Sequence, residues 1–190
     1  MSKITAIDVA NFFIDLANHS PEDDITNLKV NKLVYFAQGW SLAKFAKPLF
    51  SESIQAWKHG PVVKAVYNSF NQGGKQPIPA PTDKNYFIKF SSCQIEFLID
   101  IYNEYGKFTA GALTEQTHLP GTPWSKYYKK DVKNITIPQS AIKEYFENMP
   151  DIPSSFSFDV SKIKTVGYRD TNGHYIIPKD EDDEEYEDDE

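Results

Sequence analysis

Two histidines, one cysteine and one glycine pair are the residues of this chain that could support catalysis or metal binding. His59 and His118 are candidates for a general-base pair or for metal ligands, but no second cysteine accompanies Cys93 in the chain. Gly73-Gly74-Lys75 lacks the first glycine and the hydroxyl residue of a phosphate-binding loop. We therefore expect structural hydrogen bonds at both histidines, a buried Cys93, and neither catalysis nor a bound metal or cofactor.

A second group of residues is typical of protein contacts. Trp57-Lys58-His59-Gly60-Pro61 is expected on a loop or edge, where either packing or partner contact explains a tryptophan. Trp40, by contrast, is expected in the core. Lys32 and Gln38 interrupt apolar helix faces, so they either cap buried backbone groups or offer polar contacts. The candidate partner-binding residues are Lys32, Tyr35, Gln38, Trp57, Lys58, His59, Pro61, Tyr67, His118 and Trp124.

The elements that position these residues are mostly helices. Apolar residues at helical spacing, together with capping and breaking residues, predict about six helices and an added short turn of helix. The pattern changes to alternation after Pro150, and an Asn-Gly dipeptide marks a β-hairpin. The expected helices cover residues 5–18, 27–45, 62–70, 92–105, 109–117 and 138–149, with the short turn at 124–128 and the hairpin at 165–177.

The helix at 27–45 is apolar on two sides, which is typical of a helix at the centre of a bundle. Gly39 in its middle costs about 1 kcal/mol relative to alanine, a cost that the close approach of another backbone would offset. Gly60-Pro61 is expected to form a turn, with Pro61 at the first position of the next helix. Ile95, Leu98, Ile99 and Tyr102 are expected to face the core.

The charge of the chain is concentrated at one end. Of its 27 acidic residues, ten lie in residues 180–190, so the rest of the chain carries 17 against 20 basic residues. Such an acidic run is expected to be disordered and either solubilises the protein or occupies a basic surface on a partner. The balance of charge disfavours nucleic-acid binding. We expect a helical domain at 1–149, an extension with the hairpin at 150–178, and an acidic tail at 179–190.

Length and composition limit the class of protein. A chain of 190 residues can bury a core without disulfides or metals, and its single cysteine fits a reducing compartment. No apolar run reaches the roughly 20 residues of a membrane-spanning helix. Asp8 comes too early for a secretory signal, and the N-terminal stretch has no small-residue cleavage site, so we expect no such signal. A cytoplasmic protein with mainly α structure, a compact bundle of about six helices, is expected.

Two stretches of the sequence resemble a known family, the Panacea domain, also called SocA-like and, in prophages, GepA-like. Residues 28–40 read LKVNKLVYFAQGW, close to the family's LKLQKLLYFAQGW, and residues 48–50 (PLF) and 55–62 (QAWKHGPV) follow as its PLF and EAW-x-YGPV do. Leu113, Thr117-His118 and Pro123-Trp124 are similar to its later elements. Val30-Asn31, Gln55 and His59 depart from the usual residues, which indicates that partner choice differs from that of relatives.

The resemblance implies protein binding rather than catalysis. Members of the family are antitoxins, encoded beside small toxins that include alarmone-synthetase-like inhibitors of translation. Most bind and neutralise the toxin, whereas one branch delivers its toxin to an AAA+ protease. We therefore expect an antitoxin with a protein toxin as its partner. The alternatives are a protease adaptor, an enzyme that modifies the toxin or its product, and a DNA-binding autorepressor.

Overall fold

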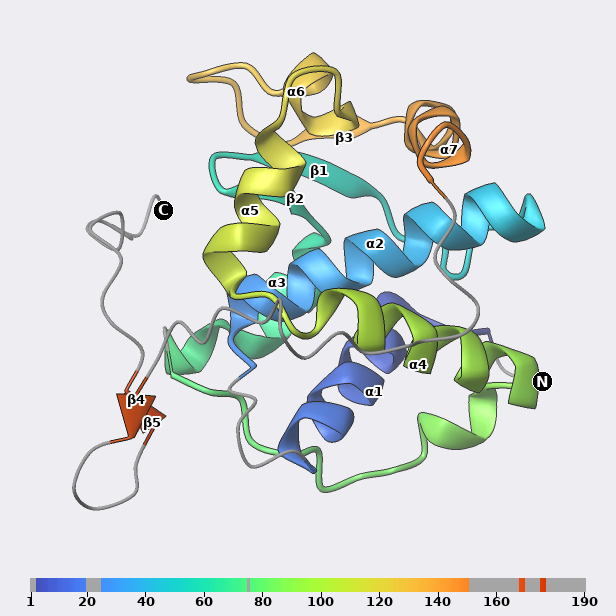
Figure 1. Cartoon of the computed structure of the whole chain (residues 1–190), viewed down its shortest axis with the longest axis vertical. Coiled ribbons are helices and arrows are strands. Elements are labelled where there is room, and N and C mark those ends of the chain that lie inside the picture. The colour runs from blue at the N-terminus through green and yellow to red at the C-terminus, as the bar shows by residue number, and fades with distance from the viewer. Residues whose placement is uncertain (1–2, 20–24, 75, 151–167, 170–174, 177–190) are drawn as a thin grey trace. The chain divides into compact units, whose positions relative to one another are not determined.

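The helix α2 (Asn27–Phe45) is the element around which the helical part of the protein packs (Figure 1). The computed structural model describes residues 3–19, 25–74, 76–150, 168–169 and 175–176. The chain divides into two units, Met1–Ile152 and Pro153–Glu190. No helix of the described residues is long and apolar enough to span a membrane.

The bounds of α2 are those that the sequence predicted. The Thr26 hydroxyl accepts the Lys29 N–H at its start, and Ala46 ends it in the left-handed conformation, with φ 51°. Nearly every side chain of α2 is buried, because other helices of this unit pack around it. The prediction of a central helix is confirmed, and Trp40 lies in the core as expected.

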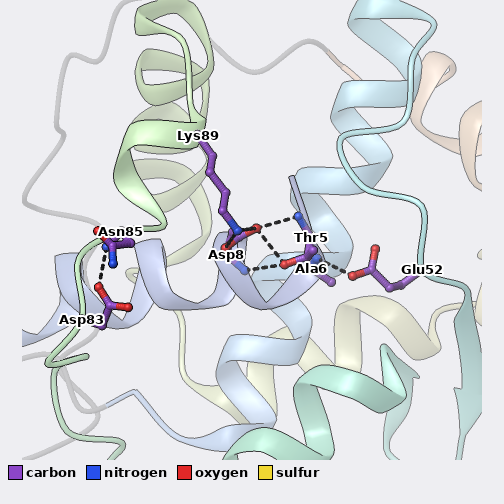
Figure 2. Close-up of polar contacts among 7 residues, drawn as sticks. All are labelled: Thr5, Ala6, Asp8, Glu52, Asp83, Asn85 and Lys89. Atoms are coloured by element: carbon purple, nitrogen blue, oxygen red, sulfur yellow. Dashed lines mark hydrogen bonds and ion pairs between the residues drawn. The ribbon is translucent and has the colours of Figure 1, made fainter. Parts of the chain in front are cut away.

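The first helix, α1 (Ala6–Asn18), begins in a capping box (Figure 2). Thr5 and Asp8 exchange hydrogen bonds, while Lys89 donates to Asp8 at 2.8 Å and Glu52 accepts the Ala6 N–H at 3.0 Å. Burial by itself raises the pKa of Asp8, but the bonds from Lys89 and Thr5 outweigh it and hold the pKa below its ordinary value. Three distant segments therefore meet at the start of α1.

A three-stranded antiparallel sheet follows α2. It consists of β1 (Ile54–Trp57), β2 (Gly60–Val62) and β3 (Ile135–Ile137) in the order β2-β1-β3. Trp57 pairs with Gly60 and Ala56 with Pro61, so the turn between the strands is Lys58-His59. The prediction of a Gly60-Pro61 turn was wrong. A proline is tolerated in β2 because β2 is an edge strand.

The next helix, α3 (Lys64–Phe70), therefore begins after β2 and not at Pro61. Two short 3-10 turns, η1 (Asn71–Gly73) and η2 (Phe87–Lys89), lie in the connection to α4 (Ser92–Tyr105). The bounds of α4 match the prediction, but of the four residues expected to face the core only Leu98 is fully buried. The face turned to the core carries Phe97, Leu98, Ile101 and Tyr105, and Ile99 is exposed.

Cys93 also differs from its prediction. It is exposed and lies in the first turn of α4, where Ser91 and Ser92 are exposed too, and the buried residues of this helix begin one turn later at Phe97. The expectation of a buried small side chain was wrong.

Three more helices complete this unit: α5 (Ala110–His118), α6 (Pro123–Tyr127) and α7 (Gln139–Glu147). An ideal Cβ at Gly39 of α2 would lie 2.3 Å from the Phe146 ring of α7. A side chain, and not the backbone predicted from the sequence, approaches Gly39. The third strand, β3, was not predicted, since three residues are too few to show alternation.

In the second unit, β4 (Tyr168–Arg169) pairs antiparallel with β5 (Tyr175–Ile176). Tyr168 pairs with Ile176 and Arg169 with Tyr175, which agrees with the predicted hairpin. Its Asn-Gly turn and the acidic tail at 179–190 lie outside the described residues, so the prediction for the tail stays a prediction.

Candidate protein-binding site

Six half-buried aromatic and imidazole side chains meet where the β1–β2 turn contacts α3, α5 and α6. We call this surface the aromatic face. Its members are Trp57, His59, Tyr67, His118, Trp124 and Tyr128.

One half of the aromatic face is a stack of three rings. His118 lies on Trp124 with ring centroids 3.6 Å apart, and Trp124 lies on Tyr128 at 4.6 Å. The stack forms because the Thr122 hydroxyl caps α6 and donates to the Thr117 carbonyl at 2.7 Å, which fixes α6 against the end of α5. Rings at positions 124 and 128 then fall one turn apart.

The other half is carried by the β1–β2 hairpin. The Trp57 ring meets Tyr67 of α3 edge to face, with centroids 4.9 Å apart, and its Nε1 donates to Gln55. The Trp124 Nε1 donates to the Trp57 carbonyl at 2.7 Å, which joins the two halves. Both indole N–H groups are thus satisfied inside the protein, and the two tryptophan side chains remain half-exposed.

Polar side chains of α2 bind the backbone of the segments that enter and leave the hairpin. Gln38 accepts the Leu49 and Phe50 N–H groups at 2.8 and 3.3 Å and donates to the Phe50 carbonyl at 3.0 Å. Asn31 accepts the Val63 N–H at 3.2 Å. Of the two roles that the sequence left open for Gln38, the structure therefore shows the capping of buried backbone groups.

Lys32 lies beneath the hairpin with none of its surface exposed. Its Nζ donates to the Pro61 carbonyl at 3.4 Å, and burial lowers its pKa to about 7. An ideal Cβ at Gly60 would lie 2.8 Å from this Nζ and 2.9 Å from the Thr117 Oγ1, and Gly60 has φ +107°. Both the conformation and the space require glycine here.

His59 and His118 lie close enough to Lys32 for its charge to affect them. Burial, followed by the charges of Lys58 and Lys32, lowers the pKa of His59. Burial, followed by Lys32 and His59, lowers the pKa of His118 to about 4. Both imidazoles are therefore neutral at pH 7. Among the described residues, the His118 Nε2 and the Thr114 Oγ1 are buried without a hydrogen-bond partner.

The structure brings most of the predicted partner-binding residues together. Lys58, on the exposed turn, adjoins the aromatic face, and Lys32 and Pro61 lie directly beneath it. Tyr35 is separate, because its ring packs against Phe36 and Phe146 in the core. Gln38 is also buried.

Sequence reasoning missed Tyr128, Thr114 and Thr117. Tyr128 follows Trp124 by four residues, and Thr114 precedes His118 by four, so helical spacing was the signal that pointed to two of them. Thr117 gave no such signal, because its contact with Gly60 depends on the packing of α5 against β2.

The chemistry available here is recognition by rings and a few polar atoms. Within the described residues, no group of three histidine, cysteine, aspartate or glutamate side chains is placed to hold a metal. Half-exposed tryptophan and tyrosine rings around buried polar groups are typical of protein-binding hot spots.

Comparison with known proteins gives two matches. The family model described as "Antitoxin SocA-like, Panacea domain" matches residues 30–125, half of the chain. The antitoxin SocA of Caulobacter vibrioides (strain NA1000 / CB15N) is 30% identical over 125 residues, which is 61% of this chain and 66% of that protein. The match thus spans just under two thirds of the relative's length. No solved structure matches the chain. The matched residues contain α3, α4 and α5 and nearly all of the aromatic face.

Proposed function

The chain belongs to the SocA-like antitoxin family with the Panacea domain, and from this premise we propose that it neutralises a protein toxin by binding it directly. The observation that supports direct binding is the aromatic face, with two tryptophans and two tyrosines half-exposed on a rigid support. Such rings lose little conformational entropy when a partner covers them. A standard complex buries about 1,600 Å² in total, which a domain of this size can supply.

The distribution of charge along the chain suggests which part attracts the toxin and which part recognises it. Residues 1–179 carry 20 basic and 17 acidic side chains, and residues 180–190 carry ten acidic ones. We assign the tail to attraction of a basic toxin and the aromatic face to contacts that select one toxin. Attraction of this kind raises the rate of association more than the final affinity.

Co-expression with the polypeptide encoded beside this gene tests the proposal. We expect rescue of growth and a complex that survives purification. Lys58→Glu and Tyr128→Ala are expected to weaken the complex at least tenfold, because both change the aromatic face or its edge. Ile88→Ala is the matched control, since Ile88 is 80% exposed in the 3-10 turn η2. Binding unchanged by both test variants would move the interface elsewhere.

Cells that lack an AAA+ protease distinguish sequestration from delivery. The second unit, Pro153–Glu190, is the feature that bears on delivery, because an adaptor must present a segment to the protease besides the toxin-binding surface. Sequestration predicts equal toxin levels with and without the protease. A toxin that accumulates only when the protease is absent would establish the adaptor.

Replacing His59 or His118 by alanine distinguishes an antitoxin that only binds the toxin from an enzyme that modifies it. Under our proposal, any His59→Ala or His118→Ala protein that still binds the toxin still protects the cell. Binding without protection would instead favour an enzyme that modifies the toxin or its product.

A further inference from the structure

Lys32 is a buried cation without a negative partner in the part of the chain that the structure describes. Its side chain has no exposed surface, and no carboxylate of the described residues lies within ion-pair distance of its Nζ. An ammonium group has three N–H donors, and the hydrogen bond from this one to the Pro61 carbonyl is long, at 3.4 Å. A buried charge is costly unless an opposite charge meets it.

A hydroxyl and two neutral imidazoles are among the groups near Lys32. Thr117 Oγ1 and Lys32 Nζ both lie within 3 Å of the position that a Cβ on Gly60 would occupy. The charge of Lys32 also lowers the pKa of His59 and of His118. The His118 Nε2 is buried with no hydrogen-bond partner among the described residues. We call Lys32, Thr117, His59 and His118 the Lys32 cluster. The Thr117 hydroxyl already donates to the Thr114 carbonyl at 2.7 Å, so Lys32 and His118 are the donors left to a partner, and the described residues offer them no anionic acceptor.

The two imidazoles are the part of the cluster that reaches solvent. Lys32 and Thr117 are buried, whereas His59 and His118 are half-exposed members of the aromatic face. An incoming group would therefore meet the imidazoles first and Lys32 last. Trp124 stacks on His118 and donates a hydrogen bond to the Trp57 carbonyl, so a partner that covers the two tryptophans would also exclude water from His118.

We propose that the Lys32 cluster binds one carboxylate of the bound toxin, from an aspartate or glutamate side chain that enters beside His59 and His118. The inference rests on the proposed function, since it names a chemical group of the toxin. The carboxylate would accept hydrogen bonds from Lys32 Nζ and His118 Nε2. The anionic partner of Lys32 would thus be present only in the complex.

A single carboxylate suits the cluster better than a phosphate. Lys32 provides one positive charge, and the cluster contains no arginine fork to match a doubly charged group. His118 is also the last residue of α5, and the C-terminal end of a helix carries partial negative charge. One negative charge on the ligand balances the single positive charge of Lys32, whereas two would leave the site with a net negative charge.

Acetate tests the site without the toxin. Lysine labelled at the ε-carbon gives an NMR signal for Lys32, assigned by its loss in Lys32→Met. We expect acetate, and not chloride at equal ionic strength, to shift this signal saturably and to raise its titration midpoint. The labelled signal of exposed Lys64 is the control. A Lys32 signal that responds equally to both salts would overturn the proposed carboxylate site.

The toxin complex tests the source of the carboxylate. We expect Lys32→Met to weaken the complex at least tenfold at pH 6. Above the pKa of Lys32, the wild-type protein should take up about one proton per complex, measured by calorimetry in two buffers of different ionisation heat, and Lys32→Met none. Lys58, His59 and His118 are the other titratable groups that act on this cluster.

A second variant keeps the test valid if Lys32→Met does not fold. His118→Phe preserves the stacked ring on Trp124 and removes the Nε2, so the same loss of affinity is expected. Equal affinity and no proton uptake in the wild-type complex would overturn the inference while the antitoxin function stands. Acetate binding together with an unaffected complex would show a site for a free carboxylate instead. If no complex forms, the proposed function fails, and the acetate measurement still decides whether the site exists.

Discussion

Gly60 shows how one residue can be required twice over. Its φ of +107° is strained for any residue with a Cβ, and a Cβ there would also press on Lys32 and Thr117. The sequence placed this glycine in a turn, whereas it lies in the edge strand β2. Its constraints are therefore its positive φ and the side chains of Lys32 and Thr117 beside it.

Gly60→Ala is expected to destabilise the protein by about 2–4 kcal/mol, because strain and overlap add. Chemical denaturation measures this as a lower midpoint with an unchanged slope. Gly73→Ala is the matched control, since its nearest neighbour would be 3.8 Å away and its φ is not positive. Equal stability of the two variants would contradict the contact between Gly60 and Lys32.

Lys32 makes stability depend on pH in a direction that can be worked out. Burial lowers its pKa in the folded protein to about 7 from the ordinary 10.5. Between these values the unfolded chain binds more protons than the folded one, so stability rises with pH. The slope from this one group is at most about 1.4 kcal/mol per pH unit.

We expect Lys32→Met to remove this dependence. The variant should gain stability relative to the wild type most strongly near pH 6–7, where folding must bury the charge, and the gap should narrow toward pH 9. Thermal unfolding across this range measures it, with exposed Lys64→Met as control. If the stability of the wild type fell relative to that of Lys32→Met between pH 7 and pH 9, the pH dependence would have the opposite sign and the prediction would be wrong.

At the scale of elements, the segment before the hairpin depends on α2, because a side chain of α2 makes the hydrogen bonds that its buried backbone groups need. Leu49 and Phe50 come just before β1 and are buried, so their N–H groups need acceptors inside the protein. Gln38 provides them through one amide group. The segment that enters the hairpin is thus fixed by a side chain of α2 that lies eleven residues before Leu49 in the chain.

Gln38→Leu is expected to cost about 2–4 kcal/mol, because three buried backbone groups lose their partner. Hydrogen exchange should show the Leu49 and Phe50 amides losing protection first. Gln72→Leu, on the exposed 3-10 turn η1, is the matched control. If the amides of residues 49 and 50 stayed protected in Gln38→Leu, the support of the hairpin by α2 would be refuted.

At the scale of the whole molecule, charge is separated along the chain. The ten acidic residues at 180–190 are more than a third of the 27 in the sequence. A run of like charges repels itself and adds no apolar surface to a core. We therefore expect the tail to influence encounters with a partner more than the stability of the fold.

Deleting residues 180–190 is expected to leave the unfolding midpoint unchanged and to slow association with a basic toxin several-fold at low salt. Stopped-flow association over a range of salt concentrations measures this. A tail of equal length with asparagine and glutamine in place of the acids is the control and should behave like the deletion. Unchanged association in both proteins would dismiss the role of the tail.

The sequence by itself determined the helices. Capping residues and apolar spacing placed α2 and α4 at their observed bounds and α1 at its Thr5 cap, because these signals act within a few residues of the chain. The same local signals misplaced Gly60-Pro61, and they assigned α4 a core face that includes the exposed Ile99. Local periodicity fixes a helix but not the direction from which its neighbours approach.

The tertiary structure alone decided the candidate site. Nothing in the sequence separates Tyr35, which packs in the core, from Trp124, which stacks on His118 at the surface. Likewise, only the packing of α5 on β2 places Thr117 and His118 beside a lysine some 85 residues earlier. Contacts between segments so far apart in the chain depend on how the whole core is arranged, so they cannot be predicted from local sequence patterns.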